Sequence, residues 1–241
     1  MGAGKSRAAA RMAHGAVLAM ALSGCGRTQH DPGLLVLPGR GASSYAEASG
    51  PSPLSRLVER RLAGAGTAPL SPEPCLDRAA ELLAERLDSE CELWPGWIEE
   101  HVLHHAGCPD FAADAIVVCG RGKDPKGFLD RVAIEAPKLR ADRFGSGRAA
   151  QGLFRSAWVF AAVERGAGLD PVPRSVPPES RVRLGFSLAP GLEAPRVYSM
   201  GPAGGVASEP VLLGSEPGRH LAFVRLAGPG RYWLEIMADG R

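Results

Sequence analysis

Between residues 54 and 87 the apolar side chains recur at helical spacing, in two runs separated by a turn that contains glycine and proline. Apolar residues three, four and eight positions after a first one share a helix face, which predicts an amphipathic first helix. Its apolar stripe consists of Leu54, Leu57, Val58 and Leu62. We expect Gly64 and Gly66 to end this helix, because glycine tolerates the left-handed conformation that follows many helices.

The second run predicts another amphipathic helix. Ser71 is a suitable N-cap for it, and Pro72 then occupies the first helical position, where an N–H would have no partner within the helix. The apolar stripe consists of Leu76, Ala79, Ala80, Leu83 and Leu87. The folded part of the chain is therefore expected to begin with a pair of helices.

Shorter apolar runs follow, and each predicts one further element. Tryptophan, isoleucine and valine mark a helix over 97–106, which Pro109 ends because proline disfavours a helical residue before it. A continuous apolar run at 115–118 suits a buried strand. Residues 128–134 predict a short helix, and 156–163 predict a central strand that is apolar on both faces.

From residue 181 the pattern changes to an alternation of apolar with polar or small residues, which predicts a half-buried strand. Further strands are predicted at 196–200, 211–213, 220–226 and 232–237, with glycine-containing turns between them. This spacing is typical of an antiparallel, immunoglobulin-like β-sandwich, which has about seven strands. Because five are visible and Asp239-Gly240 favours a hairpin turn, we expect the sandwich to be incomplete.

The N-terminal residues have the pattern of an export signal. Basic residues within the first eleven positions precede an apolar stretch at 15–22, which is shorter than the roughly 20 residues that cross a bilayer. Leu22-Ser23-Gly24-Cys25 resembles a bacterial lipobox, which implies cleavage before Cys25 and acylation of its thiol. The acyl chains would anchor the protein in membrane lipid. The alternative is an ordinary signal peptide that contains a cysteine by chance.

Gly26 stands where an aspartate would retain such a lipoprotein in the inner membrane, so the outer membrane is favoured, on its periplasmic or surface face. Residues 26–51 are rich in glycine, serine, proline and alanine and predict a flexible tether. Leu34-Leu35-Val36-Leu37 interrupts the tether, either as a short strand that pairs with the folded body or as an apolar patch. We assign 52–168 and 169–241 to two domains, joined by a proline-rich linker.

Composition narrows the functional classes. The chain has 241 residues, of which 45% are hydrophobic and 22% charged, and its net charge is +2. This near-neutral balance gives no reason to expect nucleic acid as a partner. Lys138, Arg140, Arg143 and Arg148 form a local basic cluster, which we expect to have no exposed aromatic residues interleaved with it. We interpret the cluster as a solvated surface that could contact a lipid headgroup or the cell wall.

Beyond Cys25, the chain contains Cys75, Cys91, Cys108 and Cys119. An even number of cysteines in an exported chain predicts disulfides, although four buried free thiols remain the alternative. We expect the pairs Cys75–Cys91 and Cys108–Cys119, because each closes a short loop at low entropic cost.

One group of residues could carry chemistry. His101, His104, His105 and Cys108 have helical spacing, so a continuing helix would place them on one face, where they could bind zinc or copper. The alternative is a solvated, histidine-rich helix face, because Gly107 can end the helix early and Cys108 can instead form a disulfide.

The two opening helices also carry a family resemblance. The arginine- and glutamate-rich helix, Gly66, Ala68-Pro69-Leu70 and the residues 75–80 (CLDRAA) resemble the opening of a CAP domain, the cysteine-rich secretory or SCP-like superfamily. Phe144-Gly145-Ser146-Gly147 and the strand through Trp158 stand in the order that this family uses. The resemblance implies an α-β-α domain, and thus an α+β protein. The cleft histidines and glutamates of the family have no counterpart signature near Gly145.

We therefore expect a non-catalytic, envelope-anchored lipoprotein whose CAP-like domain binds a lipid, glycan or protein partner. A metal-binding protein or metal-dependent hydrolase that uses His101, His104, His105 and Cys108 is the second interpretation. A purely structural envelope protein is the third.

Overall fold

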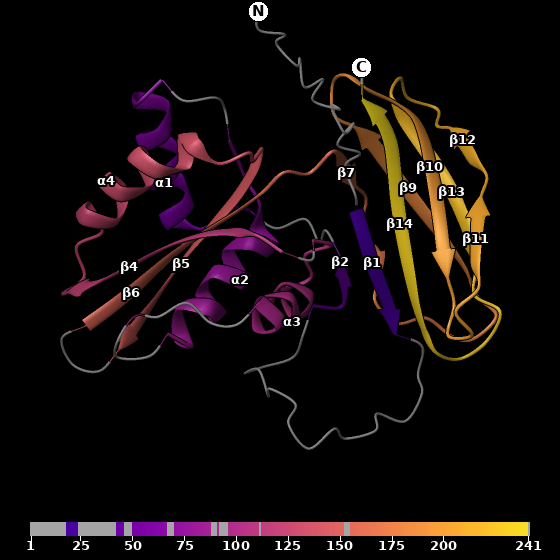
Figure 1. Cartoon of the computed structure of the whole chain (residues 1–241), viewed down its shortest axis with the longest axis horizontal. Helices are drawn as coiled ribbons and strands as arrows, with labels where there is room; N and C mark the ends of the chain where they lie inside the picture. The colour runs from indigo at the N-terminus through magenta and orange to yellow at the C-terminus, as the bar shows by residue number, and fades with distance from the viewer. Residues whose placement is uncertain are drawn as a thin grey trace, which may run out of the picture.

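The computed structural model describes residues 18–23, 42–45, 50–66, 70–87, 91, 96–110, 112–151 and 155–240. The protein is α+β, and Figure 1 shows two lobes side by side. One lobe contains the helices and a mixed sheet, and the other contains strands only. The predicted fold class is confirmed at this level.

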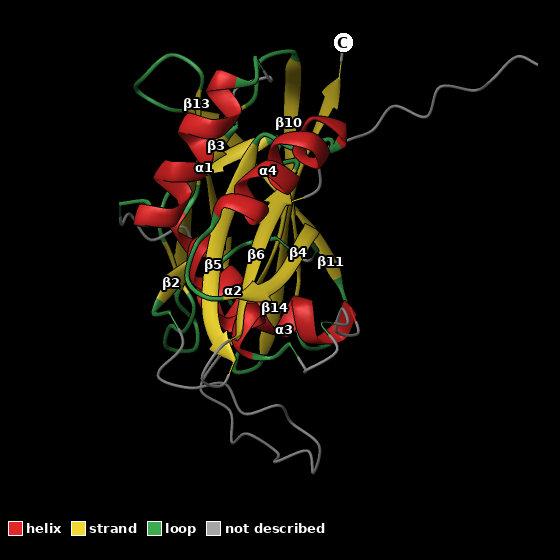
Figure 2. Cartoon of the chain, turned by 90° about the vertical axis from the view of Figure 1, so that its left-hand side faces the viewer, coloured by secondary structure: helices red, strands yellow, loops and turns green. Residues whose placement is uncertain are grey.

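The first lobe is built on a sheet that, among the described residues, has four strands in the order β3-β5-β6-β4. Its strands are β3 (Ser71–Pro72), β4 (Asp114–Arg121), β5 (Arg143–Gln151) and β6 (Arg155–Val163). β6 is antiparallel to both of its neighbours, whereas the short β3 is parallel to β5. As expected from its two apolar faces, β6 is central in this sheet (Figure 2).

Helices cover both faces of this sheet. They are α1 (Pro53–Gly64), α2 (Pro74–Glu85), α3 (Gly96–Ala106) and α4 (Lys126–Glu135), and a 3-10 turn, η1 (Ala136–Lys138), follows α4. In Figure 1, α1 and α4 lie above the strands and α2 and α3 lie below them. Val159 and Ala161 of β6 pack with α2 and α3, while Trp158 and Phe160 pack with α1 and α4. The lobe is therefore a three-layer α/β/α arrangement.

The starts of the first two helices differ in how well the sequence predicts them. Ser52 caps α1, and its hydroxyl accepts a hydrogen bond from the Ser55 N–H at 3.1 Å. The predicted cap of the second helix is wrong, because Ser71 and Pro72 form β3 against β5. That pairing holds the chain extended for two more residues, so α2 begins at Pro74 after Glu73.

Two glycines let α2 lie directly on β5. A Cβ atom on Gly145 would overlap the backbone of Leu76 and Asp77, and one on Gly147 would overlap the backbone of Ala80 and Glu81. Neither site has room for a side chain larger than hydrogen. The Phe-Gly-Ser-Gly segment therefore sets the close approach between helix and sheet.

The second lobe is a β-sandwich of two sheets around one apolar core. Within the described residues one sheet has the order β1-β14-β10-β11 and the other β12-β13-β9-β7. Their strands are β1 (Leu18–Ser23), β7 (Ala167–Leu169), β9 (Arg181–Leu188), β10 (Leu192–Met200), β11 (Val206–Glu209), β12 (Val211–Leu213), β13 (Arg219–Arg225) and β14 (Arg231–Gly240). All the pairings within these two sheets are antiparallel.

The sandwich has more strands than the sequence predicts. The expected hairpin turn at Asp239-Gly240 is wrong, because both residues continue β14 and pair with Glu193 and Leu192 of β10. The additional strands are β1, β7 and β11. β1 comes from the apolar part of the predicted signal peptide and pairs with β14 along Arg231–Ile236.

A short segment before α1 joins the lobes. β2 (Ser44–Tyr45) pairs with β8 (Val172–Pro173), and the Tyr45 side chain is buried in the sandwich core. On its other side, the Ala42 N–H donates to the His105 carbonyl at the end of α3, at 2.9 Å. This part of the predicted tether is therefore packed between the lobes.

Candidate functional site

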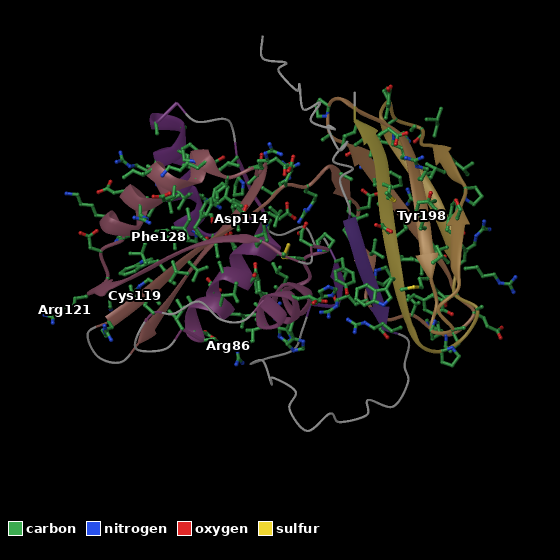
Figure 3. The ribbon with its side chains drawn as sticks, in the orientation of Figure 1. Arg86, Asp114, Cys119, Arg121, Phe128 and Tyr198 are labelled. Atoms are coloured by element: carbon green, nitrogen blue, oxygen red, sulfur yellow. A yellow bond between two sulfur atoms is a disulfide. The ribbon has the colours of Figure 1, made fainter. Side chains whose placement is uncertain are left out.

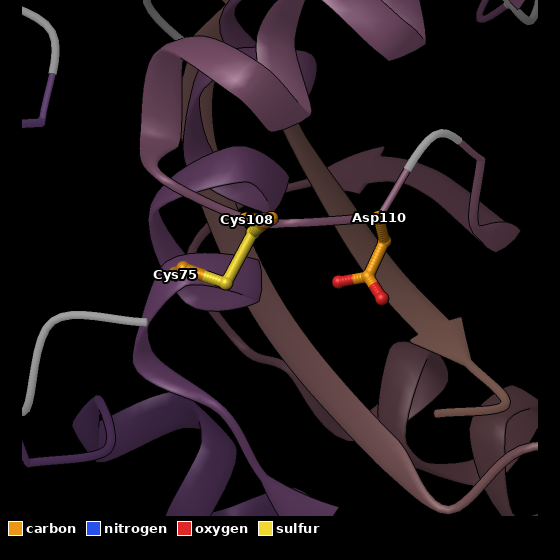
Figure 4. Close-up of side chains that lie close together, drawn as sticks. All are labelled: Cys75, Cys108 and Asp110. Carbon is orange, nitrogen blue, oxygen red and sulfur yellow. A yellow bond between two sulfur atoms is a disulfide. The ribbon is translucent and has the colours of Figure 1, made fainter. Parts of the chain in front are cut away.

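All four cysteines of the first lobe are oxidised, as predicted. The pairs are Cys75–Cys108 and Cys91–Cys119, so the predicted pairing is wrong. Loop length alone suggested neighbouring cysteines, but the fold places the start of α2 beside the end of α3. Figure 4 shows the resulting bridge between Cys75 and Cys108, with Asp110 on the segment that follows.

This bridge changes the predicted metal set. Cys108 has no free thiolate, so its prediction as a metal ligand is wrong. The potential ligand atoms of Cys75, Cys108 and Asp110 are the group of three that converges among the described residues, yet its two sulfurs are bonded to each other. Zinc or copper binding by His101, His104 and His105 remains a prediction, in which the site now has no cysteine ligand.

His104 contributes instead to the contact between the lobes. It is 6% exposed, and its Nδ1 shares a hydrogen bond with the Tyr45 hydroxyl at 3.2 Å. Burial, and then the charges of Arg231 and Arg174, lower the pKa of His104 from 6.5 to about 4. The imidazole is therefore neutral at pH 7, and it presents a polar edge to the second lobe.

Arg174 completes this contact. Its guanidinium lies 5.3 Å from the centre of the Tyr45 ring and donates to the carbonyls of Ala42 and His105 at 3.2 and 3.3 Å. Gly107 allows the approach, since a Cβ there would overlap Ala42 and the Ser44 carbonyl. The end of α3, the segment before α1 and the strand β8 are thus held together by polar contacts.

A buried ion-pair group lies where the chain leaves the first lobe. Arg165 donates to Asp110 at 2.6 and 3.3 Å and lies 3.2 Å from a Glu73 carboxylate oxygen. Burial alone lowers the pKa of Arg165, but the charges of Asp110 and Glu73 outweigh it and hold this pKa above its usual value. The sequence does carry a signal for this group, because Arg165 stands two residues after the long apolar run of β6.

A second buried polar group joins α1, α2 and β5. The Asp77 carboxylate accepts hydrogen bonds from the Ser55 hydroxyl and from the backbone N–H groups of Ser52 and Ser146, the latter two at 2.6 and 2.8 Å. The Ser55 and Ser146 hydroxyls are 2.7 Å apart, and both side chains are fully buried. These hydrogen bonds join α1 and α2 to β5.

The side chains of the basic cluster at residues 138–148 each contact a different partner. Lys138 pairs with Glu135 at 2.8 Å, and Arg143 lies 3.6 Å from Asp142. Arg148 donates to the Ser156 hydroxyl and lies 5.8 Å from the centre of the Trp158 ring. These contacts are those of a solvated surface rather than of one basic binding face.

Further charge lies at the ends of β4. Figure 3 shows Arg121 projecting from the end of the first lobe, with Asp114 at the other end of the same strand.

Cys25, Gly26 and the Leu34–Leu37 run lie outside the described residues. Among the residues that are described, no helix has both the length and the apolar character needed to cross a bilayer. No protein-family model and no curated protein sequence matches the chain.

Proposed function

We propose that the chain is an envelope-anchored lipoprotein whose folded part is a binding module rather than an enzyme. The observation that carries the proposal is the state of its cysteines. The chain has five, and Cys75, Cys91, Cys108 and Cys119 are consumed in pairs. The remaining one is Cys25 in Leu22-Ser23-Gly24-Cys25, which is the residue that the lipobox resemblance assigns to acylation. Disulfides also suit an oxidising compartment outside the cytoplasm.

The buried polar groups support a non-catalytic role. The charge of Arg165 is balanced by nearby carboxylates. The Asp77 carboxylate accepts hydrogen bonds from backbone and hydroxyl donors of α1 and its cap and of β5. A catalytic group must instead reach a substrate in a cleft. In the described part of the chain these groups hold elements together, so the metal-dependent hydrolase interpretation is not favoured.

We further propose that residues 52–168 form a divergent CAP-like domain and that the following strands form an immunoglobulin-like sandwich. Three features support the first assignment: the order of α1 and α2, the Phe144–Gly147 segment on β5, and Trp158 on the neighbouring β6. The α/β/α layering agrees with the arrangement that the resemblance implies. No cleft residue of that family is carried over, so its metal-linked activities are not proposed here.

The test is to express the whole chain and a Cys25→Ser variant in a Gram-negative host and to follow fatty-acid labelling and membrane fractionation. The unchanged chain should incorporate label and sediment with the outer membrane, whereas Cys25→Ser should be unlabelled and released. Cys91→Ala serves as the control, because it removes a cysteine without touching the lipobox and should keep the label. Equal labelling of the chain and Cys25→Ser would overturn the anchoring proposal.

Binding is tested separately from anchoring. Purified Cys25→Ser protein, immobilised through an added C-terminal tag, is incubated with solubilised envelope lipids and glycans from the same host. Retention of a lipid or glycan fraction that heat-denatured protein fails to retain would support a binding module. Retention of neither fraction would favour the purely structural envelope protein.

A further inference from the structure

The outer face of the β12-β13-β9 sheet combines cationic and apolar side chains. On β9 the even-numbered side chains Val182, Leu184 and Phe186 are buried in the sandwich core, which leaves Arg181 and Arg183 on the solvent side. On β13, Ala222 and Val224 are buried, so Leu221, Phe223 and Arg225 face outward. The register places Arg225 opposite Arg181, and Phe223 opposite Arg183.

Exposed leucine extends this face. Leu212 of β12 is 52% exposed and pairs with Leu221, so it adds to the same outer surface, and its neighbour Leu213 is 83% exposed. The guanidinium of Arg181 lies 4.7 Å from the centre of the Phe223 ring. We call Arg181, Arg183, Arg225, Phe223, Leu221 and Leu212 the arginine face.

The charge of the arginine face is not balanced by nearby acids. The ion pairs formed within the described residues do not include Arg181, Arg183 or Arg225. Asp170, the acid beside β9, is paired with Arg219, and Glu179 lies exposed in the turn before β9. Like charges directly opposite each other on paired strands destabilise a sheet. An anion between Arg181 and Arg225 would relieve this repulsion.

A groove runs along one side of the arginine face. It is a cavity of about 270 Å³ lined by Arg181 and Arg183, by Pro171, Pro173 and Val176, and by Asp170, whose carboxylate is paired with Arg219. Drug-sized ligands occupy pockets of about 300–1,000 Å³, so this groove suits a small group such as one headgroup. The prolines make its wall stiff, and the paired strand β9 fixes the two arginines.

We propose that the arginine face binds the surface of an anionic lipid bilayer. Arginine forms two-point hydrogen bonds with phosphate, and basic side chains gain about 1 kcal/mol each near an anionic membrane, which is roughly a fivefold gain in binding. Exposed apolar side chains beside cations are the usual composition of an interfacial membrane contact. Leu212 and Phe223 would contact the boundary between headgroups and acyl chains, while Arg181, Arg183 and Arg225 contact the phosphates.

This inference names a partner for the proposed function and rests on it for its cellular setting, since acylated Cys25 would keep the arginine face close to lipid. Its test does not need the anchor. The Cys25→Ser protein is mixed with vesicles of phosphatidylcholine, with or without phosphatidylglycerol, and the bound fraction is measured by sedimentation at increasing salt. Binding should require phosphatidylglycerol and weaken as salt is raised.

Substitutions then locate the contact. Each of Arg181→Ala, Arg183→Ala and Arg225→Ala should weaken vesicle binding roughly fivefold, and the triple variant about 100-fold. The matched control is Arg60→Ala, an exposed arginine on α1, which should bind like the starting protein. Leu212→Ser should weaken binding even at high salt, because it removes apolar contact.

The inference would be overturned by unchanged binding of the triple variant, by equal binding to vesicles of phosphatidylcholine alone, or by equal loss with Arg60→Ala. Full competition by soluble glycerol phosphate, with no effect of Leu212→Ser, would also do so, since it would indicate a site for small anions. Unfolding curves show whether each variant is folded, and Arg183→Lys retains the charge should an alanine variant fail. Failure of this test leaves the labelling result for Cys25 unaffected, so the two proposals fail separately.

Discussion

Arg165 and Asp110 form a two-point ion pair, with distances of 2.6 and 3.3 Å, at the place where the chain passes from the first lobe to the second. Their side chains are 3% and 9% exposed. Glu73, immediately before α2, approaches the same guanidinium. One arginine therefore ties together the end of β6, the segment after α3 and the start of α2.

Arg165→Met should lower the free energy of unfolding by about 3–5 kcal/mol, because it leaves buried carboxylates without a partner. The matched control is Arg196→Met, which breaks the exposed pair with Asp239 and should cost about 0–1 kcal/mol. Urea unfolding followed by circular dichroism measures both. Equal losses in the two variants would contradict the role of burial.

The disulfides should each contribute about 3–4 kcal/mol, because they close loops with sequence separations of 33 and 28 residues. Replacing Cys75 and Cys108 together by alanine, or Cys91 and Cys119 together, should therefore lower stability by similar amounts. Peptide mapping without reductant should recover the Cys75–Cys108 and Cys91–Cys119 pairs. Recovery of Cys75 joined to Cys91 would show that the arrangement of α2 and α3 is incorrect.

Gly145→Ala or Gly147→Ala should destabilise the first lobe by about 1–3 kcal/mol or more, because the added methyl group would force α2 away from β5. Gly127→Ala is the control: this glycine lies in α4, and a Cβ added there would meet no atom within 4 Å. It should gain about 0.5–1 kcal/mol from higher helix propensity. Thermal unfolding should thus move in opposite directions for the two kinds of variant.

The lowered pKa of His104 predicts acid sensitivity. Its folded-state pKa of about 4 is below the unfolded value of 6.5, so the unfolded chain binds more protons between these values. The contribution of His104 to the free energy of unfolding is fully present above pH 6.5. It falls by roughly 3 kcal/mol as the pH decreases to 4.

The check is the difference in unfolding free energy between the protein and His104→Gln as a function of pH. This comparison cancels the contributions of Glu81 and Glu99, whose pKa values are raised by burial and act in the opposite direction. The difference should shrink as the pH falls from 6.5 to 4. A constant difference would show that His104 is not buried in its neutral form.

The sequence predicts the helices and the central strand well because each buries a periodic apolar face. Val58 and Leu62 of α1 and Leu76 and Leu83 of α2 are buried as their spacing requires, whereas Leu57 of the predicted α1 stripe is 38% exposed. By contrast, the cap at Ser71 fails because pairing with β5, which is distant in sequence, overrides the local signal.

The candidate site is harder to predict than the helices. Which cysteines meet, and that His104 faces Tyr45, depends on how α3 lies against α2 and the second lobe. Helical spacing predicted one face for His101, His104, His105 and Cys108, but α3 ends at Ala106, before Cys108, and spacing carries no information about what a helix face contacts. Tyr45 lies in a glycine- and serine-rich stretch, where composition gives no indication of burial.

The outermost strand of one sandwich sheet, β1, is also the stretch that signal peptidase would remove if it cuts before Cys25. The newly made chain and its processed form would then differ in architecture, since removal strips β14 of its neighbour along Arg231–Ile236. Unoccupied backbone N–H and C=O groups on such a border recruit other strands. Proteolytic maturation would thus make β14, which is paired on both sides before cleavage, the border strand available to another chain.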